Sequence, residues 1–236
     1  MESIIIDLKK STAEARDSLN LWETREKAIH ALNKELYREN QIMHSLFELF
    51  DNVIESYMMN TPFLRVTGII SMKIRSLCHG MLSLALDGHA QESGALFRTA
   101  IKAYESLIYL RKDPTRIKEF LEDQKPQAGK IAKVIQGQFK EIRSYLNNHS
   151  SHFGFKPDSL MHFLQVTDDG DITLKESSFK FEILRENLGT LAVFMIQALF
   201  ESIACLHQND IDVSGCHEKL MSLYEQVETV FVNEAQ

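Results

Sequence analysis

The sequence predicts an all-α protein, an antiparallel bundle of six to eight helices with one small β-hairpin insert. Three observations lead to this class. Only four prolines and ten glycines occur in 236 residues, so long helices are permitted. Apolar residues recur at helical spacing through most of the chain. The connections between these stretches are short, which favours antiparallel neighbours.

Two amphipathic stretches at the start are expected to form an N-terminal helical arm, residues 1–57, that packs on the bundle. Residues 11–31 carry one apolar stripe among alanines and charged residues, which is typical of an exposed helix. Residues 34–57 carry a stronger stripe, typical of a packed helix. The bundle domain is expected to comprise residues 58–236.

Two signals in which a capping residue precedes a proline mark helix starts in the bundle domain. Thr61 precedes Pro62, and Asp113 precedes Pro114. Each pair places a capping side chain before a proline, which suits the first helical turn. The helices predicted for the bundle domain span residues 62–86, 90–111, 115–122, 131–146, 179–207 and 217–232.

The composition changes between the last two long apolar stretches. Gly154, Pro157 and the acidic run 168–171 are turn residues. Short apolar segments flank the acidic run, which indicates a β-hairpin. We therefore expect the hairpin insert at about residues 160–176.

Charge, cysteine content and hydropathy restrict the class of protein. The formal net charge of −7 argues against an open basic surface for non-specific nucleic-acid binding, but not against a local basic cleft. Three widely spaced cysteines form neither a disulfide framework nor a zinc pattern. The most apolar window, residues 188–200, is shorter than the ~20 residues of a membrane span. We expect a reduced, cytoplasmic protein without a membrane segment or a signal peptide.

The segment Arg143 to His152 carries the most chemistry. Its functional side chains are an arginine, a tyrosine, an asparagine and two histidines: Arg143, Tyr145, Asn147, His149 and His152. An arginine supplies a fixed cation for a phosphate, and a histidine can move protons near neutral pH. Metal-independent RNA cleavage requires both functions. The alternative interpretation is that these residues cap the end of a helix.

A second polar face is expected on the helix at 90–111. Arg98, Lys102 and Glu105 share this face at helical spacing. They either form a buried ion pair with another helix or line a polar cleft together with Arg143. No Glu-x-x-His pair, the pattern of a ferritin-like di-metal centre, occurs in the sequence, and we expect neither a metal nor a cofactor.

Residues from about 74 to 152 resemble a family of uncharacterised bacterial all-helical proteins. The resemblance rests on three segments: Ala95-Leu-Phe-Arg98, Tyr109-Leu-Arg-Lys-Asp113-Pro114, and Tyr145 through His152. Where that family places a glutamate, this chain has Lys102, with Glu105 following one turn later. The resemblance implies a helical fold and carries no established activity.

The spacing Arg143-x5-His149 resembles the Arg-x(4–6)-His signature of HEPN-type helical nucleases, with a polar Ser144 after the arginine. The resemblance implies a homodimer in which the motif faces a two-fold axis, and a role in toxin–antitoxin or phage-defence systems. Here a hairpin follows the motif, where a HEPN protein continues into a helix.

The most specific hypothesis is therefore a metal-independent endoribonuclease. Arg143 would hold the scissile phosphate and His149 would act as acid and base. The substrate-binding residues would be Asn147, His152, Arg98, Lys102 and Tyr145. Two alternatives remain: a non-catalytic module that binds a partner protein through its N-terminal arm, or a small-ligand sensor that uses the polar face. The expected partners are a second copy of the chain and either RNA or a protein.

Overall fold

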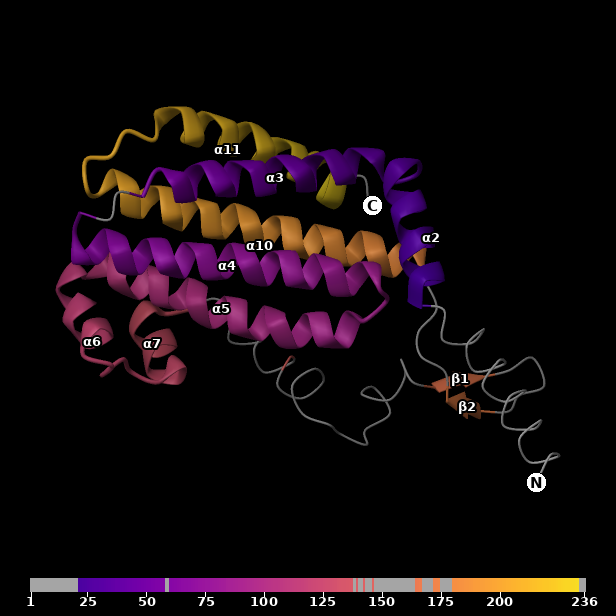
Figure 1. Ribbon diagram of the computed structural model, residues 1–236, viewed down its shortest axis with the longest axis horizontal. Helices are drawn as coiled ribbons and strands as arrows, with labels where there is room; N and C mark the ends of the chain where they lie inside the picture. Colours follow the sequence, from indigo (N-terminus) through magenta and orange to yellow (C-terminus); the bar gives the residue numbers. More distant parts are fainter. Residues whose placement is uncertain are drawn as a thin grey trace, which may run out of the picture.

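The computed structural model confirms the predicted all-α class (Figure 1). The structure describes residues 21–57, 60–137, 139, 142, 146, 164–166, 172–174 and 180–233. The α-helices of these residues are α2 (Leu21–Asn33), α3 (Tyr37–Glu55), α4 (Pro62–Leu86), α5 (Ala90–Lys112), α6 (Ile117–Leu121), α7 (Ala128–Ile135), α10 (Phe181–His207) and α11 (Ser214–Val227). A 3₁₀ turn at Pro114–Arg116 leads into α6, and a π-helical turn at Glu228–Asn233 follows α11.

The long helices α3, α4, α5, α10 and α11 form the bundle, and α10 is the central one (Figure 1). It contacts α3, α4, α5 and α11. This position agrees with its composition, because a helix that is apolar around most of its circumference must be buried on most sides. α2 packs across one end of the bundle, and α6 and α7 lie against α4 and α5 at the other end.

The direction of α10 differs from a purely antiparallel bundle. Arg185, near the start of α10, pairs at 3.0 Å with Glu39, near the start of α3. Arg111, near the end of α5, pairs with Glu201, near the end of α10. α10 therefore runs parallel to α3 and α5, while α4 and α11 run against it (Figure 1). Short connections fix only sequence neighbours as antiparallel, and α10 follows the long segment 136–180.

The start of α4 lies where the sequence predicted it. The side chain of Thr61 accepts a hydrogen bond of 3.1 Å from the backbone N–H of Leu64, with Pro62 as the first helical residue. This bond satisfies one of the donors that a helix start leaves without an intrahelical partner. Asp87 and Gly88 end the helix, and Gly88 has a φ of 83°, which glycine adopts readily.

The helix predicted over residues 131–146 is broken, which corrects the sequence-based expectation. α7 ends at Ile135 because Gln136 takes the left-handed conformation, with a φ of 55°. The N–H of Gly137 then donates to the carbonyl of Ala132 at 2.9 Å, as in a helix that closes with a left-handed residue. The ammonium of Lys112 also donates to the carbonyl of Ile135 at 3.1 Å.

Replacing Gly137 by alanine is expected to lower the free energy of unfolding by about 1–2 kcal/mol. A Cβ at this position would lie 2.7 Å from Oε1 of Glu105. Because Glu105 is only 1% exposed, its side chain cannot move away into solvent. Urea unfolding followed by circular dichroism measures the change. Gly129→Ala in α7 is the matched control, because its Cβ would meet nothing within 4 Å. Equal stability of the two variants would contradict this close approach.

α3 is part of the bundle wall. Leu46, Phe50 and Val53 are fully buried in the main hydrophobic core, and the helix packs between α10 and α11. The predicted packing of residues 34–57 is therefore confirmed. The division between an arm and a bundle domain at residue 57 stays a prediction, and residues 1–20 lie outside the described part of the chain.

Two three-residue strands lie within the predicted insert. β1 (Leu164–Val166) and β2 (Ile172–Leu174) pair antiparallel, with Gln165 opposite Thr173. The other residues of the predicted insert at about 160–176 lie outside the described residues, so the insert as a whole stays a prediction.

Two helices of the described residues, α4 and α10, are long and apolar enough to cross a membrane. In α10, 61% of the most apolar window is buried inside the protein, and in α4 the share is 28%. Core helices of soluble proteins meet the same criterion. A cytoplasmic location without a membrane contact therefore stays a prediction.

Candidate functional site

The structure describes two of the seven residues predicted to form the site. Five lie outside the described residues: Arg143, Tyr145, Asn147, His149 and His152. Arg98 and Lys102 lie one turn apart in the middle of α5, as the sequence predicted, and both side chains are half-buried.

The side chains of Arg98 and Lys102 form no ion pair or hydrogen bond with another described residue. The alternative in which they form a buried ion pair with another helix is therefore not seen among the described residues. Burial, and next the nearby charge of Lys102, lower the pKa of Lys125. The ammonium of Lys125 also lies 5.1 Å from the centre of the Phe120 ring. Positive charges from α5 and from the segment after α6 thus meet on one surface.

The stretch of sequence around these residues is basic. Residues 98–137 contain nine Lys and Arg against five Asp and Glu, a net charge of +4, whereas the whole chain carries −7. The exposed lysines of this range whose side chains enter no described ion pair are Lys112, Lys118, Lys125, Lys130 and Lys133. We call residues 98–137 the basic region. Such a concentration of one sign of charge produces a local positive field on an acidic protein.

The basic region is joined to the segment that carries the predicted motif. The ring of Phe139 lies 5.5 Å from the ring of Tyr104 on α5 and 6.2 Å from the ring of Phe194 on α10. Leu146 is 6% exposed and belongs to the same main core. Residues 139 and 146, which flank Arg143 in sequence, are therefore both packed into the bundle that carries α5.

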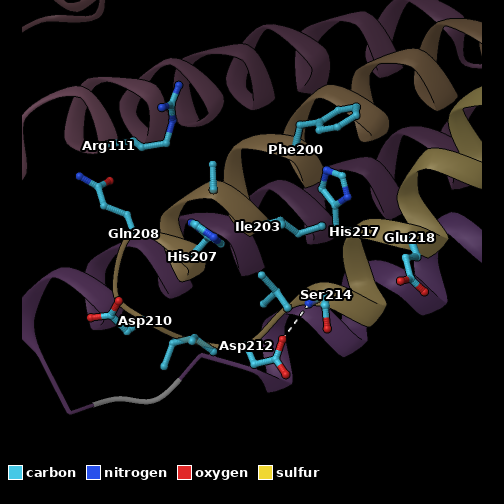
Figure 2. A pocket seen from close by; sticks show the side chains of 13 residues that line it. Arg111, Phe200, Ile203, His207, Gln208, Asp210, Asp212, Ser214, His217 and Glu218 are labelled. Atoms are coloured by element: carbon cyan, nitrogen blue, oxygen red, sulfur yellow. Dashed lines mark hydrogen bonds between the residues drawn. The ribbon is translucent and has the colours of Figure 1, made fainter.

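A pocket that the sequence did not predict lies at the end of the bundle where α10 turns into α11 (Figure 2). Its volume is about 1080 Å³. Side chains from the end of α5, the last turns of α10, the connection and the first turn of α11 line it (Figure 2). Arg98 and Lys102 are not among its lining residues, so this pocket differs from the one that the sensor hypothesis expected.

The connection between α10 and α11 has a defined conformation. Asp210 takes the left-handed conformation, with a φ of 58°, and the N–H of Ile211 donates back to the carbonyl of Leu206 at 3.2 Å. The carboxylate of Asp212 accepts a hydrogen bond of 3.1 Å from the N–H of Ser214, at the start of α11 (Figure 2). This bond lowers the pKa of Asp212. These hydrogen bonds fix the conformation of the connection that lines the pocket.

Arg111, the cation at the pocket, is held by an acid. Its Nε and one terminal nitrogen donate to the two carboxylate oxygens of Glu201, at 2.5 and 3.2 Å. Hydrogen bonding to Glu201 is the main reason that the pKa of Arg111 is raised. A two-pronged pair of this kind fixes both side chains and leaves little of the arginine charge for a ligand.

One pattern in the sequence points to this pocket. His207 and His217 are ten residues apart and bracket a polar connection with two acids, Asp210 and Asp212. Among the described residues, no three His, Cys, Asp or Glu side chains converge in a way that could hold a metal ion.

Comparison with protein-family models, with curated proteins and with solved structures gave no match for this chain. Both resemblances noted from the sequence, to an uncharacterised bacterial family and to HEPN nucleases, stay predictions.

Proposed function

We propose that this protein is a HEPN-like, metal-independent endoribonuclease that binds RNA on the basic region. The observation that supports the proposal is the pair Arg98 and Lys102, two half-buried cations on α5 that are not neutralised by any acid among the described residues. Holding unneutralised charge in partly desolvated positions is costly. An anionic partner such as RNA phosphate would remove that cost.

The packing of Phe139 and Leu146 supports the other half of the proposal. Phe139 contacts Tyr104, the residue beside the buried Glu105. Phe139 and Leu146, which flank Arg143 in sequence, both belong to the main core of the bundle. In the proposal, Arg143 and His149 face the substrate beside Arg98 and Lys102.

In the proposed reaction, His149 takes the proton from a ribose 2′-hydroxyl. The 2′-oxygen then forms a bond to phosphorus, and the bond from phosphorus to the 5′-oxygen breaks. The proton returns to the departing 5′-oxygen. Arg143 stabilises the negative charge of the phosphorane, and Asn147, Tyr145 and His152 position the nucleotide. The products are a 2′,3′-cyclic phosphate and a 5′-hydroxyl.

The test is cleavage of mixed cellular RNA by the full chain in EDTA. We expect His149→Ala and Arg143→Ala to reduce the cleavage rate by about 100-fold or more, because general acid–base catalysis contributes about 10²–10⁴. Lys102→Ala is expected to weaken RNA binding and to reduce its dependence on salt.

The matched controls are His44→Ala and Arg65→Ala, which change exposed residues on α3 and α4. Both controls should cleave like the wild type. Cleavage that requires a divalent metal, cleavage that survives in the folded His149→Ala protein, or no cleavage by the folded wild type would each overturn the proposal.

The proposal includes the homodimer that the HEPN resemblance implies, with the hairpin at about 160–176 as an insert beside the motif. Sedimentation of the full chain measures the dimer. The rival partner-binding module needs an exposed apolar patch on the N-terminal arm. Among the described residues of that arm, the large apolar side chains that are exposed are Ile29 and Tyr37, and no observation favours this rival.

A further inference from the structure

We infer that the pocket between α10 and α11 binds a small organic cation, an ammonium group carried on an apolar body. Of the residues in the basic region, Arg111 is the one that lines this pocket, and the inference does not depend on the proposed nuclease. Three properties of the pocket support the inference: an apolar floor, carboxylates that are not neutralised, and a local arginine that is already paired.

The floor of the pocket is apolar. Phe200, Ile203 and Ala204 of α10 and Val213 of the connection are apolar residues of its lining, and we call them the floor. The rings of Phe200 and His217 meet edge to face, with centroids 6.4 Å apart and an angle of 74° between their planes. A volume of about 1080 Å³ is sufficient for a small organic molecule, and apolar walls with few polar groups are typical of such sites.

The charge of the pocket is negative. Asp210, Asp212 and Glu218 line it. Asp212 already accepts a hydrogen bond from Ser214, whereas the side chains of Asp210 and Glu218 form no hydrogen bond or ion pair in the part of the chain that the structure describes. These two acids are available to a ligand (Figure 2).

The one arginine at the pocket does not offset this charge. Arg111 and Glu201 neutralise each other through two hydrogen bonds. The C-terminal end of α10 and the N-terminal end of α11 both lie at the pocket, and their partial charges have opposite signs, so the carboxylates set the sign of its charge. The pocket therefore repels carboxylates and phosphates and attracts cations.

The shape of the site favours an organic cation over a metal ion. Among the described residues no group of three ligating side chains converges, and a metal would gain nothing from the apolar floor. An ammonium group can donate hydrogen bonds to one of the exposed carboxylates of the lining, while its apolar body lies against the apolar residues of α10. An aromatic face also attracts a cation directly.

The test uses three probes of similar shape and different charge: 2-phenylethylammonium, 2-phenylethanol and 3-phenylpropionate. Binding to the full chain is measured by isothermal titration calorimetry. We expect saturable binding of the ammonium probe and at least tenfold weaker binding of the alcohol. A tenfold difference corresponds to about 1.4 kcal/mol. The carboxylate probe is expected not to bind.

Three variants locate the site. Glu218→Gln and Asp210→Asn each remove one charge, and asparagine tolerates the left-handed conformation of residue 210. Each should weaken the ammonium probe about three- to tenfold. Ala204→Phe fills the floor and should abolish binding. The matched control is Glu48→Gln, an exposed acid on α3 outside the pocket, and thermal unfolding verifies that every variant folds.

Stronger binding of 3-phenylpropionate than of the ammonium probe would overturn the inference. So would the absence of saturable ammonium binding to the folded wild type, or binding that is unchanged in both Glu218→Gln and Ala204→Phe.

Discussion

Replacing Phe194 by alanine is expected to lower the free energy of unfolding by about 3–5 kcal/mol. The side chain is 1% exposed at the centre of the bundle. Its ring contacts three aromatic rings at nearly perpendicular or steep angles, those of Phe97, Tyr104 and Phe139, with centroids 5.1, 5.8 and 6.2 Å away. Alanine would leave a cavity and remove these edge-to-face contacts.

Urea unfolding at neutral pH, followed by circular dichroism, measures the loss. The control is Val193→Ala on the same helix, because Val193 is 40% exposed and its truncation should cost less than about 1 kcal/mol. A similar loss in both variants would contradict the position of α10 at the centre of the bundle.

The free energy of unfolding is expected to fall steeply as the pH rises from about 9 to 11. Burial raises the pKa of Cys205 from 9.0 to about 12, and burial also raises the pKa of Cys78. Both thiols are fully buried. Below pH 9 both folded and unfolded chains keep these protons, so the contribution to stability is fully present. Above pH 9 the unfolded chain releases them and the folded chain does not, which favours unfolding.

At pH 11, two units above the ordinary thiol pKa, the loss is roughly 2–3 kcal/mol for each buried thiol. Tyr104 adds to it above pH 10, because burial raises its pKa from 10.0 to about 12. Burial raises the pKa of Tyr57 as well. The free energy of unfolding should therefore be markedly lower at pH 11 than at pH 8.

Urea unfolding at pH 8 and pH 11, with a reductant present, tests this expectation. In Cys205→Ala the difference in stability between the two pH values should shrink by roughly 2 kcal/mol. Cys216→Ala is the control, because Cys216 is only half-buried. If the difference is unchanged in Cys205→Ala, the thiol is not the group that titrates.

Helix boundaries could be predicted where local chemistry decides them. α4 has the predicted limits because Thr61, Pro62 and Gly88 act within one turn of the helix ends. The break after Ile135 could not be predicted in this way. Its cause is partly tertiary, since Gly137 closes against Glu105 of another helix and Lys112 caps the carbonyl of Ile135.

The two candidate sites also differ in whether local sequence or tertiary contacts bring their residues together. Arg98 and Lys102 share one helix face, so periodicity alone placed them together. The pocket required the ends of α5, α10 and α11 to meet. α5 and α10 run parallel, as the ion pair Arg111–Glu201 shows. Because of this, Arg111 lines the same pocket as His207 and His217.

The sequence by itself determined the all-α class, the face that each long helix buries and the capped ends of α4, because spacing and capping act over one or two turns. The tertiary structure alone decided that α10 is central, that it runs parallel to α3 and α5, and that a pocket forms at its C-terminal end. These features depend on contacts between residues far apart in the chain, such as Glu39 with Arg185. No local pattern encodes such contacts, because many helix arrangements bury the same apolar faces.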